Sequence, residues 1–126
     1  MLVQPYQRSI ASDGELSILM FGGTYSHALI KRPKAGDYRV QPRLGGTEQL
    51  CDAPAQAIAV AEAALAKTPV RPTYARVDLI ADDAGQWQLI ELELIGPALW
   101  LDLAPGSAAR FGAAIRCEAE QMLAKR

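Results

Sequence analysis

Two glutamates one residue apart interrupt an otherwise apolar run, and this pattern constrains the fold more than any other feature of the chain. The run spans Leu89 to Ile95 and reads LIELELI. Alternate side chains of a β-strand share one face, so Ile90, Leu92 and Leu94 are expected on one face and both glutamates on the other. The sequence therefore predicts a half-buried strand with two acids on its open face, a pattern typical of a cation site.

A second strand-like segment, Tyr74–Ala81, precedes the acidic run and carries Arg76 and Asp78. The sequence Asp82-Asp83-Ala84-Gly85 separates it from Gln86–Ile95 and has the composition of a hairpin turn. We therefore expect an antiparallel hairpin. If the turn uses all four residues, the expected pairs are Ala81 with Gln86, Asp78 with Leu89, Arg76 with Glu91 and Tyr74 with Glu93.

The open face of this hairpin would hold three carboxylates and one guanidinium. Carboxylates on direct and diagonal neighbours lie roughly 5 to 8 Å apart and repel one another unless a positive charge sits among them. Arg76 can neutralise only part of that charge. Oxygen-only ligands favour hard cations, and a site with few carboxylates and room for water and phosphate oxygens suits Mg²⁺. The pattern therefore predicts a magnesium site, and magnesium held in this way usually serves nucleotide chemistry.

A surface hairpin whose acids are solvated or ion-paired fits the same spacing. The opposite face favours the cation site, because it is apolar enough to be buried. Its residues would be Val77, Leu79, Ile90, Leu92 and Leu94. Register is the critical assumption, since a slip of one residue would move Asp78 to the other face.

Two segments of the hairpin, Ala75–Ile80 (ARVDLI) and Leu89–Pro97 (LIELELIGP), carry a resemblance to a known family. They resemble the C-terminal metal-binding hairpin of the ATP-grasp superfamily, which includes glutathione synthetase, D-alanine–D-alanine ligase and the cycloserine-forming ligases. In that family, an acid on the first strand and an acid-x-Asn or acid-x-acid pair on the second hold Mg²⁺ against the ATP phosphates. The residues that the resemblance implies are Asp78, Glu91 and Glu93 as metal ligands and Arg76 beside the transferred phosphate.

The sequence departs from the family pattern at two positions. Glu93 stands where many members have Asn, and Gly96 precedes Pro97 where close relatives often carry another acid. The first difference keeps an oxygen ligand, whereas the second changes the substrate side of the site.

The resemblance extends to the N-terminal part of the chain. Leu2–Tyr6 resembles the hinge strand that contacts adenine, which implies Gln4 and Tyr6 as nucleotide contacts. Gly14–Phe21 resembles the next strand of the family, where Glu15 would touch the ribose. Both segments also have a plainer interpretation, as an edge segment and as the polar start of a strand.

A third segment, Gly36–Gln41, resembles the family's loop whose arginine reaches the γ-phosphate, here Arg39. A solvated loop cation is the alternative. In a complete enzyme, the resemblance implies that ATP phosphorylates a small carboxylate substrate and that an amine or thiol then displaces phosphate from the acyl-phosphate. Arg76 and Arg39 would stabilise the phosphate charge, with ATP and Mg²⁺ as cofactors.

A complete ATP-grasp enzyme clamps ATP between two α+β subdomains and spans more than twice this length. We therefore expect one domain over residues 1–126, equivalent to the C-terminal part and lacking the upstream half, and we do not expect it to catalyse the reaction alone. Surfaces left uncovered would favour a homodimer or an upstream partner chain. The alternative function is a non-catalytic remnant that serves as an oligomer-forming or interaction module.

Composition limits the class of protein. A chain of 126 residues can form one domain that buries about two-thirds of its unfolded surface, and 50% hydrophobic with 21% charged residues argues against disorder. The net charge of −1 gives no electrostatic footprint for nucleic acid. The sequence has no apolar run of roughly 18 residues and no signal-peptide pattern. Cys51 and Cys117 are interpreted as reduced thiols, so we expect a cytoplasmic protein.

Before the acidic hairpin, Leu16–Phe21 and Tyr25–Lys31 are predicted to pair across Gly22-Gly23-Thr24. A mobile polar loop is expected from Arg32 to Thr47. His27 is the only histidine, and we expect a structural or surface role for it rather than general-base catalysis.

Two helices complete the predicted α+β fold, an antiparallel sheet backed by both of them. The first is expected over Ala53–Lys67, capped by Asp52 and packed on the sheet. The second is expected from a cap at Ser107 to Ala124. Its buried stripe would consist of Phe111, Ile115, Met122 and Leu123.

Overall fold

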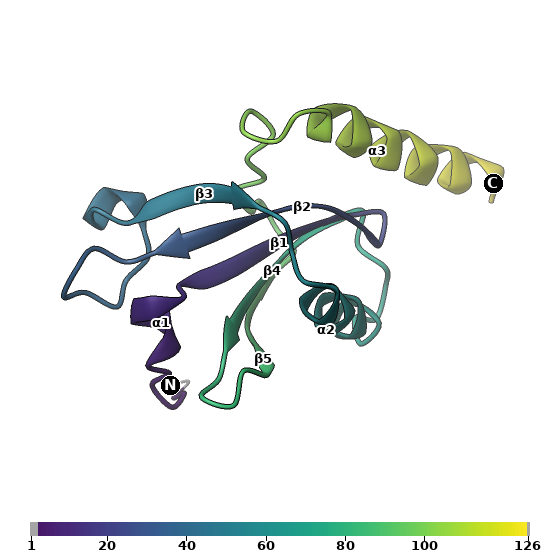
Figure 1. Ribbon diagram of the computed structural model, residues 1–126. Coiled ribbons are helices and arrows are strands. Elements are labelled where there is room, and N and C mark those ends of the chain that lie inside the picture. Colours follow the sequence, from purple (N-terminus) through teal and green to yellow (C-terminus); the bar gives the residue numbers. More distant parts are fainter. Residues whose placement is uncertain (1–2, 126) are drawn as a thin grey trace.

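The computed structural model describes residues 3–125, which form one five-stranded antiparallel sheet with helices on both faces (Figure 1). The sheet order is β3-β2-β1-β4-β5. The strands are β1 Glu15–Phe21, β2 Thr24–Arg32, β3 Thr47–Cys51, β4 Tyr74–Ala81 and β5 Trp87–Glu93. The helices are α1 Ser9–Ser12, the 3₁₀ helix η1 Pro42–Leu44, α2 Ala55–Leu65 and α3 Ser107–Ala124. The predicted α+β class with an antiparallel sheet is confirmed.

Helix α2 closes the main hydrophobic core against one face of the sheet. Alternation along β1 directs Leu16, Ile18 and Met20 to this face, where they meet the buried alanines of α2. Alanine has the highest helix propensity and allows close approach of the helix to the strands. The helix begins two residues later than predicted, because Pro54 is its N-cap and Asp52 makes no capping hydrogen bond, and it ends at Leu65 rather than at Lys67.

The predicted β1–β2 hairpin is confirmed, but its turn is Gly22-Gly23 alone, because Thr24 already pairs with Phe21 as the first residue of β2. Both glycines have positive φ values, 59° and 82°. Two positive φ values in a two-residue loop are typical of a type I′ turn, whose twist matches that of the paired strands.

Strand β3 was not predicted. It begins at Thr47, where the polar loop was expected to end, and pairs with β2 from Ala28 to Arg32. Its sequence, TEQLC, lacks a clear alternation of apolar and polar residues, because it is an edge strand with little burial. Pairing with β2, rather than local sequence, defines it.

Helix α3 has the predicted bounds, but its predicted buried stripe is wrong. Ile115, Met122 and Leu123 are exposed, and Met122 retains 61% of its accessible surface. Of the four predicted residues only Phe111 packs on the sheet, against two aromatic rings at 5.1 and 5.7 Å between centroids. Figure 1 shows the reason, since α3 crosses one end of the sheet and extends beyond it. Ser107 is its first residue rather than its cap, which is Gly106.

The predicted hinge strand at Leu2–Tyr6 is also wrong for the part that the structure describes. Residues 3–7 form no strand, and Leu2 lies outside the described residues. Pro5 lacks an N–H donor, which disfavours strand pairing at this point. The short helix α1 follows, and its Ile10 packs against Val40, Ile80 and Ile90 on the sheet face opposite α2. Among the described residues, none of the helices has the length and apolarity needed to span a bilayer.

Candidate functional site

The β4–β5 turn is one residue shorter than predicted. The backbone N–H of Asp82 donates to the carbonyl of Gln86 at 2.8 Å, so these two residues close a three-residue loop. Gly85 in this loop has a φ of 76°, a left-handed conformation that favours glycine. Ala81 therefore pairs with Trp87, and the predicted pairing of Ala81 with Gln86 is wrong.

A β-bulge between Asp78 and Leu79 shifts the register a second time. Beyond it, Asp78 pairs with Glu91 and Arg76 pairs with Glu93, in place of the predicted partners Leu89 and Glu91. Two one-residue shifts preserve the alternation of faces, so the four ionisable side chains share one face as predicted.

The bulge also changes one apolar position on β5. Ile90 packs with Ile80 on the face opposite α2, not with the main core as predicted. The other residues of the predicted apolar face, Val77, Leu79, Leu92 and Leu94, do pack in the main core.

Arg76 lies at the centre of the three carboxylates. Its Nη2 is 2.9 Å from Asp78 Oδ2 and 2.5 Å from Glu93 Oε2. Glu91 Oε2 is farther away, at 3.4 Å. Burial acts to lower the pKa of Arg76, but its hydrogen bond to Asp78 and the three negative charges raise that pKa overall. The guanidinium is therefore a permanent counter-ion within the acidic cluster.

A deeper layer of polar side chains holds Asp78, which is fully buried. Ser17 Oγ donates to Asp78 Oδ1 at 2.6 Å. Lys31 Nζ lies 3.5 Å from Asp78 Oδ2 and forms a close ion pair with Glu15. Burial is the main cause that raises the pKa of Glu15, while Lys31 acts to lower it.

Sequence reasoning missed Ser17 and Lys31 as members of the site. The available signal for Ser17 was its position as a polar residue within the apolar run Leu16–Phe21, whereas Lys31 lies between Ile30 and Arg32 and has no such signal. Ser17 can be assigned to the site only once the pairing of β1 with β4 is known, because that pairing places Ser17 beside Asp78.

The donor set fits Mg²⁺ in chemical type, because it consists of carboxylate oxygens. Within residues 3–125, however, no group of three or more His, Cys, Asp or Glu side chains is already arranged around a metal position. Arg76 occupies the space between the acids. The side chains of Glu91 and Glu93 are 60% and 32% exposed, so both have room to turn from Arg76 toward an ion.

The remaining predicted site residues lie apart from this cluster. Arg39 pairs with Asp37 in an exposed loop, with 2.8 Å between Nη2 and Oδ2. Gln4 and Tyr6 line an open groove of about 320 Å³ together with Ile80, which is two residues along β4 from Asp78. The groove thus runs toward the same face of the hairpin.

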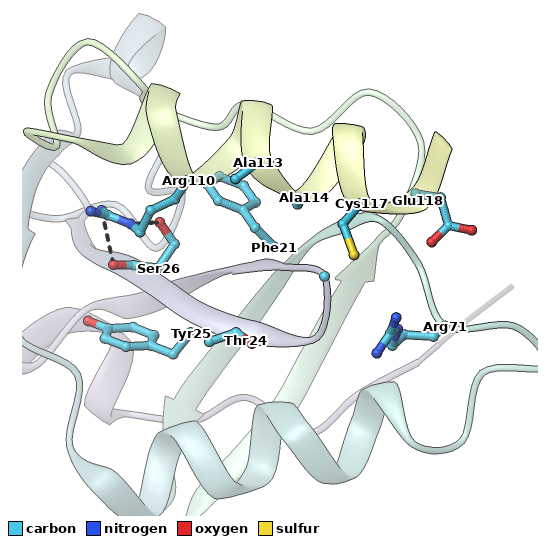
Figure 2. A pocket seen from close by; sticks show the side chains of 11 residues that line it. Phe21, Thr24, Tyr25, Ser26, Arg71, Arg110, Ala113, Ala114, Cys117 and Glu118 are labelled. Atoms are coloured by element: carbon cyan, nitrogen blue, oxygen red, sulfur yellow. Dashed lines mark hydrogen bonds between the residues drawn. The ribbon is translucent and has the colours of Figure 1, made fainter. Parts of the chain in front are cut away.

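A separate cavity of about 270 Å³ lies between α3 and the β1–β2 turn (Figure 2). Arg110 crosses its edge and donates to Ser26 Oγ at 3.0 Å. Neighbouring His27 is buried, with Nδ1 2.8 Å from Ser26 Oγ and Nε2 2.8 Å from the carbonyl of Leu99. These contacts support the structural role predicted for His27, and the cavity shares no lining residue with the Arg76 cluster.

Comparison with known proteins gives a clear relative. No protein-family model matches the chain. The chain is 33% identical over 121 residues to the cycloserine biosynthesis protein DcsG of Streptomyces lavendulae. The match covers 90% of this chain and 40% of that protein. The crystal structure of the D-cycloserine synthetase DcsG matches with a TM-score of 0.74 at 32% identity, over 89% of this chain and 40% of the other.

More distant structures share the fold. A RiPP-associated ATP-grasp ligase of Chryseobacterium gregarium matches with a TM-score of 0.61 at 18% identity, over 83% of this chain and 33% of that one. D-alanine–D-alanine ligase of Bacillus anthracis, solved with ATP, matches with a TM-score of 0.54 at 18% identity, over 85% of this chain and 40% of that one. The chain thus spans 40% of the length of DcsG. In sequence the chain is related to part of DcsG, and its fold is one that it shares with part of the ATP-grasp ligases.

Proposed function

We propose that this domain provides the Mg²⁺- and phosphate-binding face of an ATP-dependent ligase that joins a small carboxylate to an amine or thiol through an acyl-phosphate. The convergence of three carboxylates on Arg76, at the open face of the β4–β5 hairpin, carries the proposal. Homology to DcsG supports the ligase class.

Asp78, Glu91 and Glu93 would hold the metal ion in this proposal. Asp78 is already oriented by Ser17, so little ordering is required of it when an ion binds. The two glutamates are more exposed and would turn from Arg76 toward the ion. When bound there, Mg²⁺ would supply positive charge that offsets the charge of the triphosphate.

Arg76 and Arg39 would contact phosphate. A guanidinium presents planar N–H donors that match phosphate oxygens, and Arg76 is held at the ion site by its own partners. Arg39 lies in an exposed loop, from which it could reach the terminal phosphate. Both arginines would stabilise charge that develops during phosphoryl transfer.

Gln4 and Tyr6 are the proposed adenine contacts, because they line the groove that leads to the hairpin face. Glu15 was proposed as a ribose contact. Its burial and its ion pair with Lys31 favour instead a supporting role beneath Asp78.

Turnover would require more protein than the described residues provide. One hairpin face can contact the triphosphate from one side only, whereas phosphoryl transfer needs a site that positions both reactants and excludes water. We propose that a further segment or a partner chain supplies the opposite side.

The exposed apolar residues of α3 favour a second candidate, a non-catalytic module that forms oligomers or binds a partner. Ile115, Met122 and Leu123 would be covered in such an assembly.

Calorimetric titration with ATP separates the two candidates. The ligase proposal predicts binding that requires Mg²⁺ and weakens at least about ten-fold in Glu91→Gln, since one charged ligand is lost. Glu120→Gln makes the same charge change on the exposed side of α3 and should bind as the wild type does. If the wild type shows no binding at millimolar ATP with Mg²⁺, the module is the better account.

A further inference from the structure

Trp100 has an unusual backbone conformation. Its φ of 45° makes it the one non-glycine residue with a positive φ within residues 3–125. A bulky L side chain is strained in this region, and such a conformation persists only where surrounding contacts enforce it.

Buried groups hold the backbone on both sides of Trp100. The carbonyl of Leu99 lies 2.8 Å from His27 Nε2, and the carbonyl of Leu101 accepts a hydrogen bond from Ser107 Oγ at 3.1 Å. His27 and Ser107 are both buried, so they are fixed anchors. The loop before α3 is therefore tied to the sheet and to the helix at the two residues that flank Trp100.

The indole of Trp100 connects two strands across the face opposite α2. Its Nε1 donates to Glu48 Oε2 on β3 at 2.8 Å. Its ring lies against Arg76 on β4, with 5.8 Å from Cζ to the ring centroid. This distance is within the range of cation–π attraction. Arg76 thus lies between an aromatic ring and three carboxylates.

On the basis of the proposed function, we infer that Trp100 is a positioning residue for Arg76 at the phosphate site. An ion bound by Asp78, Glu91 and Glu93 would compete with Arg76 for all three of its carboxylate partners. The indole would then be the contact that holds the guanidinium independently of the ion. The hydrogen bond to Glu48 fixes the ring for this role.

A single-tryptophan variant tests the inference by spectroscopy. The chain has two tryptophans, and Trp87 packs in the core on the α2 face. Trp87→Phe therefore leaves Trp100 as the sole reporter and preserves the site. Titration with Mg²⁺ and ATP is followed by tryptophan emission and by calorimetry. The expected result is an emission change that saturates together with the heat of binding.

The two readouts separate the possible failures. Heat of binding without any change in Trp100 emission would overturn the inference and leave the proposed function intact. If no heat of binding is detected, the proposed function fails, and the inference fails with it.

Substitutions at Trp100 add a second test. Trp100→Phe keeps an aromatic face and should bind Mg²⁺ and ATP within about three-fold of the wild type, whereas Trp100→Ala should bind about ten-fold more weakly. Circular dichroism verifies that each variant is folded. A folded Trp100→Ala with unchanged affinity would refute the positioning role. If that variant does not fold, the emission result on Trp87→Phe decides.

Discussion

Replacing Lys31 with Met should destabilise the protein by about 3 kcal/mol, the lower end of the range for removing one partner of a buried ion pair. The Lys31 side chain is 9% exposed and contacts both Glu15 and Asp78. Met retains most of the apolar stem, so lost packing contributes little. Asp78 keeps its bonds to Arg76 and Ser17, whereas Lys31 is the one ion-pair partner of Glu15 among the described residues. Most of the cost therefore comes from Glu15.

Urea denaturation at pH 7, followed by circular dichroism, measures this loss, and an unchanged m-value verifies that the same transition is compared. Lys67→Met removes an exposed lysine at the end of α2 and should change stability by no more than about 0.5 kcal/mol. Adding Glu15→Gln to Lys31→Met should restore part of the loss, because no unpaired charge then remains beside Asp78. A loss below about 1 kcal/mol for Lys31→Met would refute the assignment of a buried, coupled network.

Three further outcomes follow from the same contacts. Burial raises the folded-state pKa of Glu15 above 4.5, so the stability that this group contributes is complete below pH 4.5 and is lost as the pH rises through the raised pKa. The difference in free energy of unfolding between the wild type and Glu15→Gln should therefore fall over that interval. A difference that stays constant with pH would contradict the burial of this carboxyl. Gly14→Ala should cost at least about 2 kcal/mol in urea denaturation, because Gly14 has a φ of 80° and its added Cβ would collide with the carbonyl oxygen of Lys31. Phe111→Ala should speed limited proteolysis of α3 by removing its aromatic contacts with the sheet, whereas Ile115→Ala, at an exposed position, should not; equal cleavage rates would argue that Phe111 does not anchor the helix.

Alternation along the acidic strand was sufficient to predict which ionisable side chains share the open face of the hairpin. Period-two patterning determines which residues share a face, and it brought Asp78 to the side of Glu91 and Glu93. The cross-strand partners were wrong, because the loop uses three residues and a bulge follows at Asp78. Neither the three-residue loop nor the bulge has a local sequence signal strong enough to be predicted in place of a four-residue turn. The two shifts together preserve the face, so Arg76, Asp78, Glu91 and Glu93 still lie on one side of the hairpin.

The layer beneath Asp78 could not be predicted in the same way. Ser17 and Lys31 reach Asp78 because β1 lies between β2 and β4 in the sheet. That neighbour relation joins segments about sixty residues apart and leaves no periodic signal in either. Tertiary pairing likewise determines the edge strand β3.

Helix α3 shows a different limit of sequence patterns. Apolar residues at helical spacing indicate that a face can be buried, but not which element covers it. Within residues 3–125, only the Phe111 end of that face meets the sheet. Ile115 and Met122 remain exposed.

The position of a bound divalent cation tests the central claim most directly. Mn²⁺ accepts the same oxygen ligands as Mg²⁺ and can be located by its anomalous scattering in crystals grown with a non-hydrolysable ATP analogue. The account predicts one anomalous peak, from an Mn²⁺ ion that is coordinated by carboxylate oxygens of Asp78, Glu91 and Glu93. Arg76 is expected to turn toward a phosphate oxygen. A bound nucleotide whose metal ion is coordinated by none of these three carboxylates would contradict it.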